Sequence, residues 1–242
     1  MFRFQIDNDS HWCYFIGEKD KTQLQHRPVA LASFQAIKSQ FEQLFGTDYV
    51  RTRPVISVLH HIDGPESFRE NGIIVLSADI SCGLQFAYQF SHELCHCMVP
   101  KTVPQRFRWF EETLCQLASI YFIKAIYRAE NLPRELEFYR DYVSWYFNSL
   151  CKDTPRITGT AGAFIQHYQV RLESEPYLRD TNRAIALVLL PMFELYPSLW
   201  RIVTRLHLLD PAEDLLPNLR RICRDLCLDP LPVDELMRLL GQ

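Results

Sequence analysis

The sequence has no apolar run long enough to cross a lipid bilayer. Its longest apolar stretch, Ala184 to Phe193, is interrupted by Pro191 and is about half as long as the ~20 residues that a transmembrane helix needs. The first residues, Met1 to Asp7, lack the basic and then apolar segments of a signal peptide. We therefore expect a cytoplasmic protein without a membrane partner.

A strong excess of charge is also missing. The chain has 29 acidic and 26 basic residues, a net charge of -3, and no basic run that could follow a phosphate backbone. This balance predicts no nucleic-acid partner. Internal repeats and low-complexity segments are absent as well, and an apolar content of 48% excludes a disordered chain.

Paired cysteine motifs are missing, although the chain has eight cysteines. There is no C-x-x-C pair, and Cys95, Cys97 and Cys115 lie within apolar helical patterns. These features favour buried, reduced thiols in a cytosolic protein over a disulfide framework. Cys223 and Cys227, one helical turn apart, are interpreted in the same way as packing residues.

Residues 2–17 show the alternation of apolar and polar residues that is typical of strands, and residues 55–59 and 73–76 are short apolar, β-branched runs bounded by proline, glycine and aspartate. We expect a hairpin over residues 2–17 with its turn at 7–10, a helix over 28–45, and two strands at 55–59 and 73–76 joined by a loop at 63–66. Gly46 ends the helix. These elements predict a small sheet with one helix.

From Gly83 onward the apolar spacing is helical. The predicted helices cover residues 83–98, 105–129, 134–150, 160–172, 182–196, 198–208, 212–227 and 233–240. The aromatic residues from Tyr139 to Phe147 have helical spacing and are interpreted as a packed helix face. The sequence therefore predicts one α+β domain over residues 1–242. Its three parts are a sheet-containing part (1–82), a segment of two helices (83–130) and a helical part (131–242).

The string His92-Glu93-Leu94-Cys95-His96 has the H-E-x-x-H form. Two histidines four residues apart on a helix point the same way, and neutral imidazoles are good zinc ligands. Glu93 is displaced around the helix axis, so it is placed to take the proton of an activated water. Gln85 and Gln89 lie on the same polar stripe. The string predicts a zinc site with Glu93 as general base.

A catalytic zinc site needs a third protein ligand. The continuation H-x-x-G-x-x-H is excluded, because Val99 and Thr102 stand where the glycine and the third histidine would be. The other route is a carboxylate from the next helix, where Glu111 and Glu112 are both candidates. We prefer Glu112, which lies four residues after Arg108, a side chain that could orient it.

The segment from residue 71 to 116 resembles the gluzincin branch of zinc metallopeptidases. The resemblance rests on His92-Glu93-x-x-His96 followed by Trp109-x-x-Glu112-Thr113-x-Cys115. It implies a zincin-like fold with one zinc ion bound by His92, His96 and Glu112, and Glu93 as the general base. It also implies that the strand Ile73–Leu76 lines the rim of the cleft and pairs with an extended peptide.

The sequence departs from the gluzincin pattern at several points. Only fifteen residues separate His96 from Glu112, Thr113 replaces a glycine or alanine, and Gln116 replaces an acidic partner. The transition-state oxyanion also needs a donor, for which His167 and Tyr168 are the candidates.

Three functions are compatible with these residues. The first is a zinc metallopeptidase that acts on a peptide or protein substrate. The second is a non-hydrolytic iron enzyme, because two histidines and one carboxylate also form the site of iron(II) oxygenases. The third is a non-catalytic zincin-like binding module, with a regulatory protein partner on the helical C-terminal half.

Overall fold

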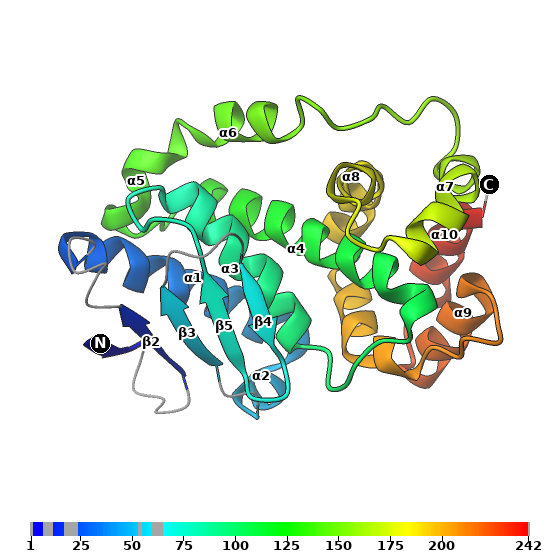
Figure 1. Cartoon of the computed structure of the whole chain (residues 1–242), viewed down its shortest axis with the longest axis horizontal. Helices are drawn as coiled ribbons and strands as arrows, with labels where there is room; N and C mark the ends of the chain where they lie inside the picture. The colour runs from blue at the N-terminus through cyan, green and yellow to red at the C-terminus, as the bar shows by residue number, and fades with distance from the viewer. Residues whose placement is uncertain (1, 7–11, 17–23, 53–54, 60–64, 242) are drawn as a thin grey trace. The chain divides into compact units, whose positions relative to one another are not determined.

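The structure is a computed structural model of the chain (Figure 1), and it describes all residues except 1, 7–11, 17–23, 53–54, 60–64 and 242. The predicted turn at 7–10 and the start of the predicted loop at 63–66 lie outside the described residues. Contacts divide the chain into two compact units. The first unit comprises Met1–Met98 and Ala118–Ser149, and the second comprises Val99–Leu117 and Leu150–Gln242. The predicted single domain with three parts stays a prediction.

The first unit contains a mixed sheet of five strands, so the predicted α+β class is confirmed. The strands are β1 (Phe2–Gln5), β2 (Trp12–Ile16), β3 (Val55–Leu59), β4 (Glu66–Phe68) and β5 (Ile73–Leu76). Their order is β1-β2-β3-β5-β4, with β2, β3 and β5 parallel and the two edge strands antiparallel to their neighbours. The predicted hairpin and both predicted strands are confirmed, while β4 was not predicted.

Strand β5 lies inside the sheet and not at its edge. Residues Ile73 to Leu76 pair with β3 on one side, and Ile73 to Val75 pair with β4 on the other. Its backbone groups are therefore already used in the two ladders. The prediction that this strand pairs with an extended peptide is wrong, because the described edge strand on this side is β4.

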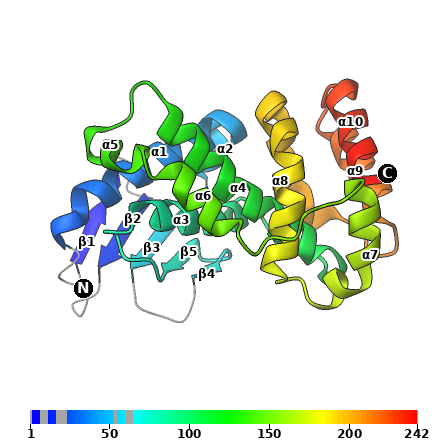
Figure 2. The ribbon, with the colours of Figure 1, turned by 90° about the horizontal axis from the view of Figure 1, so that it is seen from above.

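Two helices cover one side of the sheet. Figure 2 shows α1 (Arg27–Phe45) and α3 (Gly83–Cys97) on the same side of the strands. On β5, Ile74 and Leu76 are fully buried, while the alternate residues are only half-buried, as expected for a sheet covered on one face. Phe34 on α1 joins the layers through ring contacts with Tyr14 of β2 and Phe90 of α3, at centroid distances of 4.9 and 4.5 Å.

The helix predicted over residues 134–150 is two helices in the structure. They are α5 (Arg134–Arg140) and α6 (Val143–Leu150). Between them the N–H of Tyr142 donates to the carbonyl of Tyr139, three residues back, at 3.0 Å. This tighter bond replaces the i to i−4 bond of an α-helix and ends α5. A short helix, α2 (Thr47–Arg51), was also not predicted.

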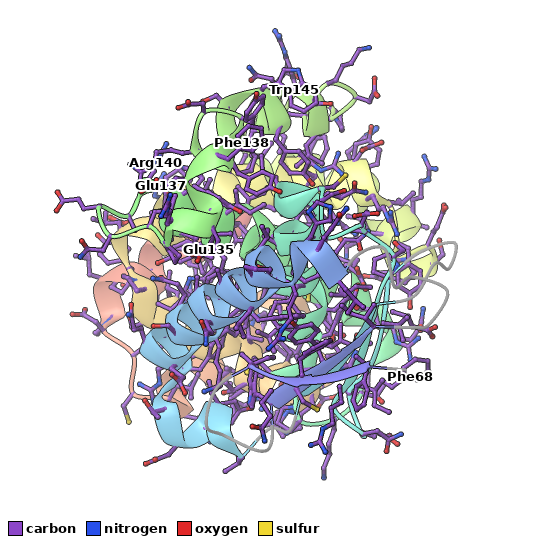
Figure 3. The ribbon with its side chains drawn as sticks, turned by 90° about the vertical axis from the view of Figure 1, so that its left-hand side faces the viewer. Phe68, Glu135, Glu137, Phe138, Arg140 and Trp145 are labelled. Atoms are coloured by element: carbon purple, nitrogen blue, oxygen red, sulfur yellow. The ribbon has the colours of Figure 1, made fainter. Side chains whose placement is uncertain are left out.

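The predicted packed face of aromatic residues on this segment is wrong for its outer members. Tyr142 is 46% exposed and Trp145 is 66% exposed, as is Phe138 of α5 at 68%. No side chain of α6 is buried. Figure 3 shows Phe138 and Trp145 on the surface of the first unit. The aromatic spacing correctly indicated helices, but it did not indicate a core.

The second unit is helical in the part that the structure describes. It contains η2 (Gln105–Phe107), the first residues of α4 (Arg108–Arg128), α7 (Ala161–Ser174), α8 (Arg179–Leu195), η3 (Pro197–Leu208), α9 (Leu215–Asp225) and α10 (Pro230–Gly241). The predicted helix over 198–208 is thus a 3₁₀-helix. Thr160 caps α7 by accepting a hydrogen bond from the N–H of Ala163 at 3.2 Å, a common way to begin a helix.

Among the described residues, no helix is both long enough and apolar enough to cross a membrane.

Candidate metal centre

Helix α3 carries both histidines of the H-E-x-x-H string. The rings of His92 and His96 lie one turn apart, with their centroids 5.1 Å from each other. His96 is 6% exposed, whereas His92 is partly accessible. Their neighbours Leu94 and Cys95 are fully buried. The helix is therefore fixed by its apolar side, and the histidines occupy its polar stripe.

Glu112 completes a group of three potential metal ligands. One ligand atom each from His92, His96 and Glu112 lies within 4.8 Å of the other two. In the part of the chain that the structure describes, this is the one group of three histidine, cysteine or carboxylate side chains at such distances. Glu111, the alternative ligand, is 3% exposed and is not in the group. The geometry therefore favours Glu112.

The donor set suits a zinc ion. Two imidazoles and one carboxylate form a common catalytic zinc site, with bonds of about 2.1 Å and hence about 3.4 Å between ligand atoms. Distances of up to 4.8 Å would need small side-chain rotations to reach that value. The types of donor in this group therefore fit a zinc ion.

Glu93 is a nearly buried carboxylate beside this group. Its side chain is 5% exposed, and among the described residues it has neither a hydrogen-bond donor nor a cationic partner. A buried carboxylate usually has such a partner, because desolvation of a charge is costly. No ion pair or hydrogen bond among the described residues therefore explains the burial of this carboxylate.

Arg108, which we expected to orient Glu112, does not do so in the structure. Its guanidinium forms no hydrogen bond or ion pair with any described residue. Glu112 has other interactions. The prediction about Arg108 is therefore wrong. The long side chain can extend into water instead of lying along the helix.

Thr113 occupies the position where the gluzincin pattern has a glycine or alanine. Its hydroxyl donates to the carbonyl of Trp109 at 2.9 Å and lies 3.3 Å from Oδ1 of Asn182 on α8. The amide of Asn182 in turn donates to the carbonyl of Pro176 at 2.7 Å. Thr113 and Asn182 are both buried. The hydroxyl therefore ties the beginning of α4 to α8 within the second unit, which an alanine would not do.

Gln89 is a further polar residue of the stripe on α3. Its Oε1 accepts hydrogen bonds from the N–H groups of Ala78 and Ser77, at 2.8 and 3.2 Å, and its Nε2 donates to Oγ of Ser77 at 3.0 Å. These bonds join α3 to the residues that follow β5. The sequence placed Gln89 on the stripe, but it gave no signal for a partner twelve residues earlier.

The cysteines beside the histidines are core residues, as predicted. Cys95 and Cys97 are buried, and burial raises the pKa of the Cys97 thiol to about 12, which keeps it protonated and a poor ligand. All eight cysteines are described, and none is in a disulfide. Cys223 is buried, as predicted for a packing residue, whereas Cys227 is exposed, so the prediction of packing is wrong for Cys227.

The candidate oxyanion donors are both on α7. His167 is exposed and its ring contacts that of Tyr168, with centroids 4.9 Å apart. Tyr168 also contacts Phe164 at 4.7 Å. These contacts describe a helix surface, and the role of either residue as a donor stays a prediction.

Comparison of the chain with models of protein families, with curated proteins and with solved structures found no match in any of the three.

Proposed function

We propose that the protein is a zinc-dependent metallopeptidase with a zincin-like fold. The observation that carries the proposal is the group His92, His96 and Glu112, whose ligand atoms lie within 4.8 Å of each other. A nearly buried carboxylate, Glu93, lies next to His92 on the same helix. Metal ligands and a general base are the parts that hydrolysis of a peptide bond requires.

His92, His96 and Glu112 would hold the zinc ion. When bound, zinc lowers the pKa of a coordinated water toward about 7 and accepts charge from a polarised carbonyl. Glu93 takes the proton of the attacking water and then delivers it to the leaving amine, as a positioned general base and acid. Its low exposure keeps bulk water away from this proton.

An extended peptide substrate would add to the sheet at β4. This strand is the described edge next to β5, and its residues Glu66 and Phe68 are exposed. Extended peptides commonly bind to an open sheet edge through main-chain hydrogen bonds. Because β4 has only three residues, the peptide would be held over a short length.

Metal content tests this proposal directly. Protein without a histidine tag is purified without chelators, and its metals are measured by plasma emission for wild type, Glu112→Ala, Glu111→Ala and Glu93→Gln. We expect about one zinc per chain in wild type, Glu111→Ala and Glu93→Gln, and none in Glu112→Ala. A peptide library should be cleaved by wild type, and cleavage should fall by about 10²–10⁴-fold in Glu93→Gln.

Wild-type protein that binds no zinc after zinc addition would overturn the proposal. Tightly bound iron without zinc, in protein purified without oxygen, would instead support a non-hydrolytic enzyme with two histidines and one carboxylate. Glu93→Gln with undiminished peptide cleavage would exclude Glu93 as the base.

A second candidate function is a protein-binding module, and the exposed aromatic residues of the first unit favour it. Phe138 and Tyr142 contact each other with ring centroids 5.1 Å apart, and Trp145 follows on α6. Exposed aromatic side chains grouped on one surface are typical of interaction sites. Figure 3 shows Phe138 and Trp145 with the charged side chains around them.

The exposed aromatic rings suggest the chemistry of such a partner. Glu135 and Glu137 form no ion pair with a described residue, and Arg140 donates to the carbonyl of Ala129 at 3.0 Å. The exposed aromatic rings would suit a segment with lysine or arginine beside apolar side chains, because cations bind aromatic faces, although the two arginines of α5 balance its two glutamates. Calorimetry with a lysine–leucine peptide would test it, with loss of binding expected in Trp145→Ser and not in Glu93→Gln.

We also propose a cytoplasmic location. The eight cysteines, all thiols, support a reducing compartment.

A further inference from the structure

The side chain of Gln89 forms hydrogen bonds with two residues outside its own helix, Ser77 and Ala78. The residue is only half-buried, yet its carboxamide bonds to Ser77 and Ala78 through both of its polar atoms. Fixing a long side chain costs conformational entropy. The hydrogen bonds therefore offset an entropy cost that an unbonded side chain at this position would not have.

The two N–H groups that Gln89 binds belong to the backbone just after β5. The last paired residue of β5 is Leu76, which pairs with Leu59 of β3. Ser77 and Ala78 have left the ladder, so their N–H groups need another acceptor. Oε1 of Gln89 accepts both of them, at 3.2 and 2.8 Å. The exit of β5 is thereby held on α3.

The same helix carries the metal ligands. Gln89 lies three residues before His92 and four before Glu93, so all three project from one side of α3. The other end of the connection is β5, which pairs with β4, the edge strand. A single side chain thus links the strands next to the site with the helix that carries the histidines.

We propose that Gln89 is a positioning residue for the candidate metal centre. It fixes the distance between the β4–β5 edge and the helix of His92 and His96, so that a peptide on the edge meets the ligands in one register. This inference rests on the proposed function for its effect on substrate, whereas the link between β5 and α3 stands on the hydrogen bonds alone.

Gln85 provides a matched control. It is the same residue type, one turn earlier on the same stripe, but it is exposed and forms no hydrogen bond with a described residue. Gln89→Met keeps an unbranched side chain of similar size and removes all the bonds. Gln89→Glu keeps an acceptor for the two N–H groups. The Ser77 hydroxyl, which accepts a hydrogen bond from Gln89, can rotate and donate one to the glutamate carboxylate instead.

The test compares wild type, Gln89→Met, Gln89→Glu and Gln85→Met. Amide hydrogen exchange at Ser77 and Ala78 should become about ten-fold faster in Gln89→Met only, the effect of losing a hydrogen bond of typical strength. Zinc affinity, measured by chelator competition, should change by less than about three-fold, because the ligands stay on their helix. For a cleaved library peptide, KM should rise about ten-fold and kcat should stay within about two-fold.

Unchanged exchange in Gln89→Met, or equally fast exchange in Gln85→Met, would overturn the inference. So would a fall in kcat with KM unchanged, because Gln89 would then act on the ligands and not on the edge. A wild type without zinc or cleavage would overturn the proposed function instead, and the exchange rates would still decide whether Gln89 holds β5 on α3.

Discussion

Thr113 and Asn182, 69 residues apart in the sequence, bring their polar side-chain atoms to 3.3 Å inside the second unit. Thr113 follows Glu112 directly, so the contact fixes the turn of α4 that carries the candidate ligand. Thr113 is fully buried and Asn182 is 1% exposed. The neighbouring hydrogen bonds to Trp109 and Pro176 complete the network.

Thr113→Val should therefore destabilise the protein. The substitution keeps the shape but removes the hydroxyl, whose single proton can bond to either the Trp109 carbonyl or Oδ1 of Asn182, and the loss of a buried hydrogen bond costs about 1–3 kcal/mol. Urea unfolding would measure the loss. Thr113→Ser, which keeps the hydroxyl, is the control and should be more stable than Thr113→Val. Equal stability of the two variants would show that the hydrogen bond contributes nothing.

Removal of zinc should lower the stability of the wild type. A ligand present at about 1,000 times its Kd stabilises the folded state by about 4 kcal/mol, and a chelator should abolish this gain. His96→Ala should show no difference between zinc and chelator in urea unfolding. His167→Ala is the matched control, because its side chain is exposed on α7, and it should respond as the wild type does. A zinc response that persists in His96→Ala would contradict the assignment of this ligand.

The sequence predicted the strands and helices that a run or a period of neighbouring residues marks. Short apolar, β-branched runs identified β3 and β5, and helical spacing identified α1 and α3. β4 has only three residues, too few to show a period. The break between α5 and α6 is marked by one hydrogen bond from Tyr142 to Tyr139, which no sequence pattern indicates. The twelve residues of η3 are too few for apolar spacing to distinguish a 3₁₀-helix from an α-helix.

In the candidate site, too, the sequence predicted some residues and missed others. His92, Glu93 and His96 follow from the spacing of the H-E-x-x-H string. Glu112 followed from the gluzincin resemblance and from an expected contact with Arg108 that the structure does not show. The supporting contacts could not be predicted, because Gln89 reaches back to Ser77 and Thr113 reaches forward to Asn182. Such pairs depend on how elements pack, which a single sequence does not show.

Gly83, the first residue of α3, should not tolerate a side chain. A Cβ at this position would lie 2.7 and 2.8 Å from Cζ and Cε2 of Tyr139. The Tyr139 hydroxyl donates to the carbonyl of Ser81 at 3.0 Å, so the ring cannot move without losing this bond. We expect Gly83→Ala to lower the free energy of unfolding by about 1–3 kcal/mol, the usual cost of overpacking.

A double-mutant cycle tests the cause of that loss. In a Tyr139→Leu background the ring is gone, so Gly83→Ala should cost clearly less than in the wild type. Burial raises the pKa of Tyr139, and displacement of the ring in Gly83→Ala should bring that pKa back toward its ordinary value. Ultraviolet titration would follow it. An equal cost of Gly83→Ala in both backgrounds would place the strain elsewhere.

Cys223 should make stability depend on alkaline pH. Its thiol is 1% exposed, and burial raises its pKa from the ordinary value near 9 to about 11. The unfolded chain therefore loses this proton at lower pH than the folded chain. The contribution to stability is fully present below about pH 9 and is lost as the pH rises through about 11, by up to about 2–3 kcal/mol.

Urea unfolding at about pH 8 and about pH 11 separates this effect from the packing of the side chain. Cys223→Ala should lose some stability at both pH values through the cavity it leaves. Its further loss on going to the higher pH should be smaller than that of the wild type, because the group that titrates is gone. Cys227→Ala is the control, since its side chain is exposed, and it should lose as much as the wild type. An alkaline loss in Cys223→Ala as large as in the wild type would assign the pH dependence to other groups.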